Sequence, residues 1–139
     1  MNTTINTKDL EDMLSSENGL KNFINNRKSN KLIVHLFLST IMKQQDISRS
    51  QLIEKAGLNR VYAYEVFRGE KRPSRNILLR MLISLNLDFQ QVQLVLKRLG
   101  YPILYAKNFR DAIIIYCLKN QKDVDDVCIL LYDSGHDII

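Results

Sequence analysis

Hydrophobic positions occur along this chain in short helical stretches separated by polar residues and glycines. Residues 31–45 form the most continuous stretch and are apolar on almost every face of a helix, which predicts a central buried helix. The chain shows neither the strict alternation nor the hairpin turns typical of strands, even in the β-branched run at residues 113–115. The expected fold class is therefore all-α.

Capping residues locate two short helices in the middle of the chain. Ser48 is suited to cap a helix over residues 49–56, and Gly57 is suited to end it in the left-handed conformation. Asn59 is suited to cap a second helix over residues 60–67. We therefore expect two helices joined by a tight turn that contains glycine.

Further capping and breaking residues divide the remainder of the chain. Ser74 is suited to cap one helix, and Asp88 is suited to cap another that ends before the Gly-Tyr-Pro sequence at residues 100–102. Beyond this break we expect two more helices, the first starting at residue 108 or 109 and ending at 118, the second covering residues 124–132.

The two ends of the chain differ from its centre, residues 31–100, which we take as the main domain. Residues 1–30 are rich in Asn, Ser and Thr and predict a weakly helical arm that either docks through its apolar side chains or stays mobile. Residues 101–139 contain more apolar side chains than one helix face can hold, so we expect this extension to pack on the domain and to help form a homodimer. The apolar residues of the arm are Leu10, Met13, Leu14, Leu20, Phe23 and Ile24.

The formal charge of +5 is concentrated in one segment. Residues 49–80 contain eight basic and three acidic side chains and so carry +5, whereas residues 1–48 carry +1 and residues 81–139 carry −1. A basic segment is expected of a surface that binds phosphates, although such segments are also common on solvated faces. The basic residues are Arg49, Lys55, Arg60, Arg68, Lys71, Arg72, Arg75 and Arg80.

Two parts of this segment resemble the lambda-repressor/Cro (XRE) family. They are ISRSQLIEKAGLNR at residues 47–60 and VFRGEKRPS at residues 66–74, and the resemblance extends over about residues 31–90. It implies a compact five-helix domain containing a helix-turn-helix, with additional N- and C-terminal helices in this chain. It also implies a transcriptional regulator, in most cases a repressor, that binds double-stranded DNA as a homodimer.

The resemblance assigns base contacts to the second helix of the motif, residues 60–67. Arg60, Val61, Tyr64 and Glu65 would face the major groove. The guanidinium of Arg60 could pair with guanine through two hydrogen bonds, whereas Glu65 could accept from cytosine and Val61 could contact a thymine methyl group.

The resemblance assigns phosphate contacts to residues around that helix. Arg49 begins the first motif helix and Arg68 follows the second, and both match family positions that contact the DNA backbone. Ser74 would present a helix N-terminus to a phosphate. Lys71, Arg72 and Arg75 lie close to Ser74 in the sequence and complete the expected set.

Aromatic residues set this helix apart from the family pattern. Val61, Tyr62 and Tyr64 stand where the family normally has Ser, Thr or Gln. The tyrosine hydroxyls could reach phosphates, and the rings, like that of Phe67, could instead be packing residues. A second hypothesis is therefore a protein-interaction adaptor that uses this face to bind an acidic or phosphorylated partner.

Other classes of function have little support in the sequence. We find no glycine-rich phosphate loop, no ordered Ser/His/Asp set and no spacing typical of a metal site, so we expect no enzyme activity and no cofactor. Cys117 and Cys128 are expected to be reduced packing residues, and no residue pattern indicates a small-molecule pocket between the core and the C-terminal helices. The chain has neither a secretion signal nor an apolar run long enough to cross a bilayer, which favours the cytoplasm.

Overall fold

The computed structural model describes residues 30–139, which form seven helices and no strand, so the all-α prediction is confirmed for this part of the chain. The predicted N-terminal arm lies almost entirely outside the described residues. The helices are α3 (Asn30–Gln45), α4 (Arg49–Ala56), α5 (Arg60–Phe67), α6 (Arg75–Ser84), α7 (Phe89–Arg98), α8 (Phe109–Lys119) and α9 (Val124–Asp133).

Side-chain caps begin six of these helices. Each capping oxygen accepts a hydrogen bond from the backbone N–H three residues later, as in the 3.1 Å bond from the Gln51 N–H to Ser48 Oγ. The caps predicted at residues 48, 59, 74 and 88 are all present, and Asp123, from an acidic cluster, caps α9. Short polar side chains therefore fix the start of each of these helices.

The turn between α4 and α5 depends on Gly57. This residue has φ 64° and ψ 44°, the left-handed conformation that glycine adopts without steric cost. A Cβ atom at this position would lie 3.2 Å from Nη1 of Arg80 on α6. The turn is therefore tight as well as left-handed, and α4 packs against both α5 and α6.

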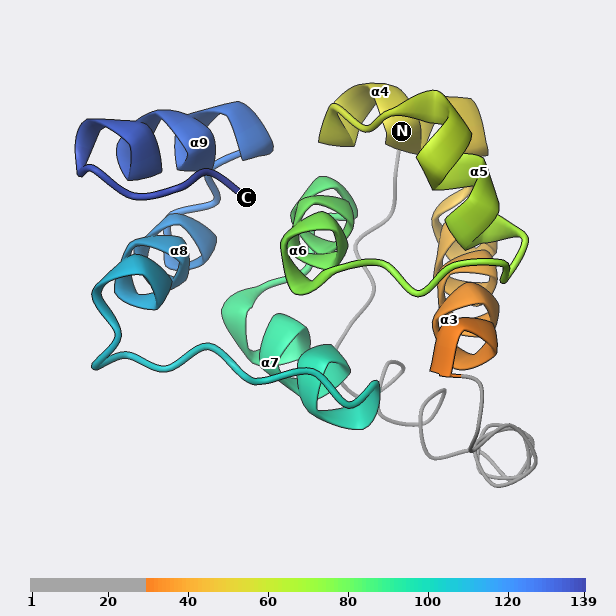
Figure 1. Cartoon of the computed structure of the whole chain (residues 1–139), viewed down its shortest axis with the longest axis horizontal. Helices are drawn as coiled ribbons and strands as arrows, with labels where there is room; N and C mark the ends of the chain where they lie inside the picture. The colour runs from red at the N-terminus through yellow and green to blue at the C-terminus, as the bar shows by residue number, and fades with distance from the viewer. Residues whose placement is uncertain (1–29) are drawn as a thin grey trace.

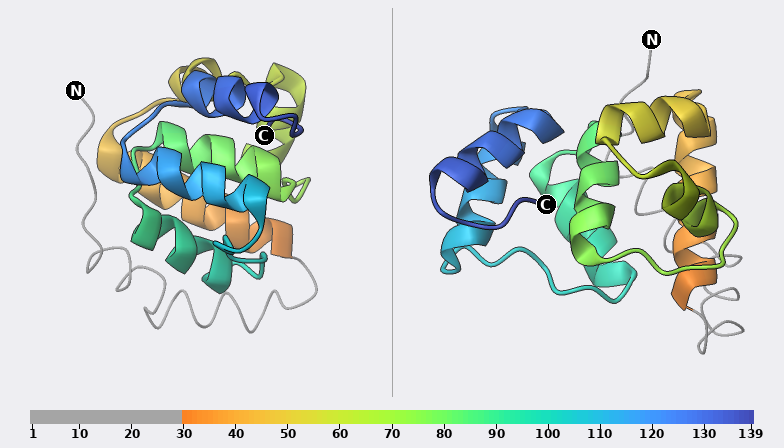
Figure 2. Two further views of the ribbon diagram at one scale, coloured as in Figure 1. Left: turned by 90° about the vertical axis from the view of Figure 1, so that its left-hand side faces the viewer. Right: turned by 45° about the horizontal axis from the view of Figure 1, so that its top comes forward.

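Helix α6 occupies the centre of the molecule (Figure 1). The α4–α5 pair and α3 lie on one side of it, and the hairpin of α8 and α9 lies on the other, an arrangement also visible in Figure 2. Contacts join α6 to α4 and to α9, α3 to α5, and α7 to α8. The C-terminal hairpin therefore leaves α5 uncovered.

The prediction that residues 31–45 form the central buried helix is wrong in part. Helix α3 buries one face, which carries Val34, Leu38 and Ile41, while Leu36 on another face is 39% exposed. Helix α6 instead takes the central position, because the C-terminal hairpin covers the face that α4 leaves open. Residues 78, 79, 81 and 82 of α6 are all completely buried.

The segment between α7 and α8 has no regular secondary structure, yet side chains bind five of its carbonyl groups. Gln93 donates to the Leu104 carbonyl at 2.8 Å and accepts from the Leu104 N–H at 2.7 Å. The carbonyls of residues 99, 100, 102 and 103 accept hydrogen bonds from Arg72 and Arg75. The path of this connection is therefore fixed by Arg72, in the loop before α6, and by Arg75 and Gln93, on α6 and α7.

Candidate nucleic-acid interface

The outer face of α5 presents together the four residues predicted to contact bases. Arg60 and Val61 are exposed, the latter by 71%, and Tyr64 and Glu65 are half-buried beside them. The opposite face of the helix carries Ala63, Val66 and Phe67, which are buried. Folding therefore sorts this 8-residue helix into one face that packs and one that can meet a partner.

Two of the exposed basic residues predicted to contact phosphates, Arg68 and Lys71, are paired with acids of the same chain. Arg68 donates from Nε and Nη2 to both carboxylate oxygens of Glu70, at 3.1 and 3.0 Å, and these bonds lower the pKa of Glu70. Lys71 Nζ lies 3.4 Å from Oε2 of Glu65 and 5.6 Å from the ring centroid of Tyr62. Both cations stay more than half exposed, so they can still approach a phosphate.

Arg49 and Arg60 lie at the two ends of an aromatic row. The guanidinium carbon of Arg60 is 5.9 Å from the ring centroid of Tyr64, and that of Arg49 is 5.7 Å from the ring centroid of Phe67. The two rings meet edge to face, 6.1 Å apart with 84° between their planes. The row therefore connects the first residue of α4 with the first residue of α5.

Arg72, predicted to contact phosphate, turns toward the chain after α7. It donates to the carbonyls of Leu99 and Gly100 at 3.2 and 3.3 Å, and its guanidinium lies 4.0 Å from the ring centroid of Tyr101. Tyr101 in turn donates to the Pro73 carbonyl at 2.6 Å, and burial raises the pKa of its hydroxyl to about 12. This cation therefore holds the end of α7 against the start of α6.

Arg75, also predicted to contact phosphate, forms an ion pair with a buried aspartate of α8. Its two terminal nitrogens donate to Asp111 at 3.0 and 2.9 Å, and it also donates to the carbonyls of Pro102 and Ile103. Burial favours the protonated carboxyl, but the bonds from Arg75 and from the Tyr105 N–H outweigh this effect and lower the pKa of Asp111. Arg75 therefore attaches the C-terminal hairpin to α6.

Arg80 adds a second attachment of the same kind. It donates to the carbonyls of Ala56 and Ile139 and lies 3.4 Å from Sγ of Cys128, so it links α4, α9 and the chain after α9. Sequence reasoning counted Arg72, Arg75 and Arg80 toward a basic surface and missed these roles. One available signal was Asp111, an acidic residue in an otherwise apolar helical stretch, which needs a partner when buried.

Ser74 lies at the N-terminus of α6, as predicted, and its exposed hydroxyl accepts from the Ile77 N–H at 3.2 Å. That bond satisfies one of the free N–H groups at the start of the helix. The neighbouring guanidinium of Arg75 faces the connection to α8. Ser74 and Lys71 therefore remain as the exposed polar groups of the predicted phosphate set at this end of α6.

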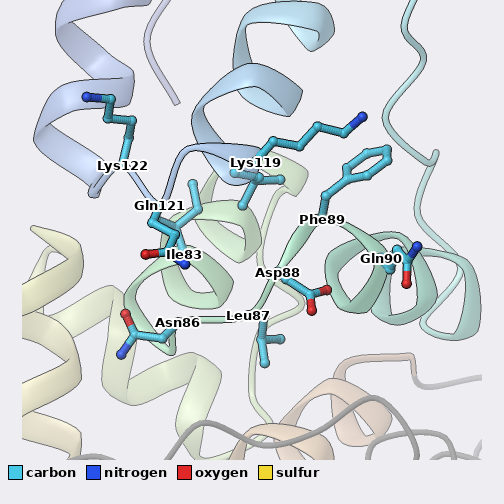
Figure 3. A pocket seen from close by; sticks show the side chains of 10 residues that line it. Ile83, Asn86, Leu87, Asp88, Phe89, Gln90, Lys119, Gln121 and Lys122 are labelled. Atoms are coloured by element: carbon cyan, nitrogen blue, oxygen red, sulfur yellow. The ribbon is translucent and has the colours of Figure 1, made fainter.

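A cavity of about 770 Å³ lies between the α6–α7 turn and the α8–α9 turn (Figure 3). Its lining combines apolar side chains with three amides, two ammonium groups and the carboxylate of Asp88, and Lys119 Nζ lies 5.1 Å from the Phe89 ring centroid. The sequence did not indicate it, because its walls come from turns more than 30 residues apart.

Comparison of the chain with protein-family models, with curated proteins and with solved structures found no match.

Other features of the described residues narrow the chemistry available. From residue 30 onward, no group of three or more His, Cys, Asp or Glu side chains is placed to hold a metal ion, and no helix is long and apolar enough to span a membrane. Cys117 is buried, which raises the pKa of its thiol, and Cys128 is half-buried beside Arg80. The outer face of α5 is the strongest candidate site because it exposes Arg60 and Val61 side by side.

Proposed function

We propose that this protein is a cytoplasmic, sequence-specific DNA-binding regulator of transcription, most simply a repressor. In this proposal α3 to α7 form a five-helix domain of the lambda-repressor/Cro type, with α4 and α5 as its helix-turn-helix and α5 as the recognition helix. The observation that supports it best is the outer face of α5. That face carries Arg60 beside Val61 and is not covered by the C-terminal hairpin.

In this proposal Arg60 reads a guanine and Val61 contacts a neighbouring thymine methyl group. Arg49, Arg68, Lys71 and Ser74 then position the domain on phosphates, while Arg72 and Arg75 act mainly inside the protein. Glu65 is joined to Lys71, so it approaches a cytosine only when that exposed pair opens.

A second copy completes the proposal, because one 8-residue helix reads few base pairs. The C-terminal hairpin carries exposed Phe109, Ile129 and Tyr132, which are suited to a homodimer contact. Light scattering on the purified protein at micromolar concentration tests this part. A strictly monomeric protein, with or without DNA, would contradict it.

The test of DNA recognition is selection of bound duplexes from a random library at near-physiological salt. Wild type should enrich a palindromic motif. Arg60→Ala should relax discrimination at one base position in each half-site and weaken the binding free energy for the motif by about 1–3 kcal/mol. Arg98→Ala is the matched control, because it removes one exposed positive charge from α7 rather than from α5. It should retain the motif. Folded wild-type protein that enriches no motif would overturn the proposal.

The protein-interaction adaptor is the second candidate, favoured by the ion pairs of Arg68 with Glu70 and Lys71 with Glu65. These pairs reduce the positive charge available to DNA beside α5, and Val61 offers an exposed apolar contact. Salt titration separates the candidates, because DNA affinity should fall linearly with the logarithm of salt concentration by about one unit of slope per phosphate contact. DNA binding with a slope near zero would favour the adaptor.

A further inference from the structure

The aromatic row across α5 and α4 places Tyr64 beneath the base-reading arginine of the proposed function. The Tyr64 ring lies 5.9 Å from the guanidinium carbon of Arg60 and meets the Phe67 ring at 84°. Phe67 is 2% exposed, so core packing fixes its position. Tyr64 therefore has a buried ring on one side and an exposed cation on the other.

A ring held in this way restricts the arginine before any partner binds. A free arginine side chain has considerable rotamer freedom, and binding must order it. A cation–π contact at an exposed site is weak but directional, so it favours the conformations of Arg60 that lie over the ring. Fewer conformations then have to be lost when the guanidinium pairs with a base.

We infer that Tyr64 is a positioning residue for Arg60, and that it acts through its ring and not through its hydroxyl. The inference rests on the proposed DNA-binding function. It accounts for a tyrosine at a position where the lambda-repressor/Cro pattern normally has Ser, Thr or Gln. Arg49 lies over the Phe67 ring at the other end of the row, and that ring meets the Tyr64 ring edge to face. The base-reading and backbone-contacting arginines thereby share one support.

Two substitutions separate the ring from the hydroxyl. Tyr64→Phe keeps the ring and removes the hydroxyl, so it should retain the affinity of wild type and its discrimination at the base that Arg60→Ala identifies. Tyr64→Leu removes the ring and should reduce that discrimination about 2- to 5-fold, with the salt slope unchanged. In the Arg60→Ala background, Tyr64→Leu should have no further effect on discrimination, because its effect passes through Arg60.

Tyr62→Leu is the matched control, since it removes a ring from the same helix that lies under Lys71 and not under Arg60. It should leave discrimination at the Arg60 base unchanged. Thermal unfolding of each variant shows whether the domain is folded. If Tyr64→Leu does not fold, Tyr64→Phe still tests whether the hydroxyl is needed.

The outcomes distinguish the inference from the function on which it rests. No enriched motif with wild type overturns both. A wild-type motif that Tyr64→Phe loses as strongly as Tyr64→Leu overturns the inference alone, because the hydroxyl would then contact the DNA. Equal losses from Tyr64→Leu in the presence and absence of Arg60 also overturn it.

Discussion

The outer face of α5 and the C-terminal hairpin have opposite surface chemistry. Among the described residues from 46 to 100, Val61 is the one large apolar side chain that is strongly exposed. Residues 49–80 carry +5, and five of their eight basic side chains are exposed: Arg49, Lys55, Arg60, Arg68 and Lys71. Residues 109–139 carry three basic and six acidic side chains, giving −3. Exposed large apolar residues after position 100 are Ile103, Tyr105, Phe109, Tyr116, Ile129, Tyr132 and Ile138.

This difference favours a polyanion at the first surface and a protein at the second. The negative charge of the hairpin disfavours nucleic acid there. Several exposed apolar side chains on one surface typically mark a protein contact. Arginines of α6 nevertheless link the hairpin to the rest of the molecule, because Arg75 binds Asp111 of the hairpin and Arg80 binds both Ala56 at the end of α4 and Ile139 after the hairpin. The regions therefore differ in chemistry but share one framework.

Breaking the ion pair between Arg75 of α6 and Asp111 of the hairpin should have the largest effect. Arg75→Ala leaves the carboxylate of Asp111, whose side chain is 9% exposed, without its partner, and should lower the free energy of unfolding by about 3 kcal/mol in urea titration. Arg68→Ala is the control, because its pair with Glu70 is exposed and should contribute no measurable stability. Equal losses of unfolding free energy in the two variants would mean that Arg75 does not hold the hairpin against α6.

The turn before α5 should respond less strongly. Gly57→Ala places a Cβ atom at φ 64° and 3.2 Å from Arg80 Nη1, so it should cost about 2 kcal/mol of unfolding free energy. Gly135→Ala also has a positive φ but meets no atom within 4 Å, so it should cost about 1 kcal/mol. A smaller loss at Gly57 than at Gly135 would argue against a constrained turn.

Acid should weaken the attachment of the hairpin through Asp111. The folded-state pKa of this carboxyl lies below 3.8, so its charged form contributes stability above 3.8 that is lost as pH falls through the folded pKa. The unfolding free energies of wild type and Asp111→Asn should therefore differ most at neutral pH and converge below 3.8. Urea titrations at neutral and acidic pH measure this, and a difference independent of pH would contradict it.

Changes on the exposed hairpin should alter stability least. Ile129→Ser and Tyr132→Ser remove exposed side chains, so each should change the unfolding free energy of the monomer by less than about 0.5 kcal/mol. If the hairpin forms the dimer, these variants should nevertheless shift light scattering toward monomer. An unchanged dimer mass in these variants would mean that the dimer contact lies on another surface.

The sequence predicted the local structure better than the surface. Capping at Ser48, Asn59, Ser74 and Asp88 depends on neighbouring residues, so the bounds of α4 and α5 followed from the sequence. The outward face of α5 was instead assigned by the resemblance to the lambda-repressor/Cro family. What Arg72 and Arg75 bind depends on carbonyls about 27 residues away, which no local pattern encodes.

The central position of α6 was missed for a related reason. A continuous apolar run indicates that a helix such as α3 can be buried, but which helix gains neighbours on both sides depends on where the C-terminal hairpin folds back. The sequence also gave no direct sign of the aromatic row, because Arg49 and Phe67 meet only through tertiary contact between α4 and α5.

The side-chain bonds to the chain between α7 and α8 restrict how this protein can be dissected. A fragment that stopped near residue 100 would keep α3 to α7, yet Arg75 and Gln93 would lose their carbonyl acceptors and Arg75 would also lose Asp111. Deletion of the last two helices would therefore not yield a minimal module. The C-terminal hairpin is thus bonded to α6 and, through the connection before it, to α7, and we expect truncation near residue 100 to lower the free energy of unfolding.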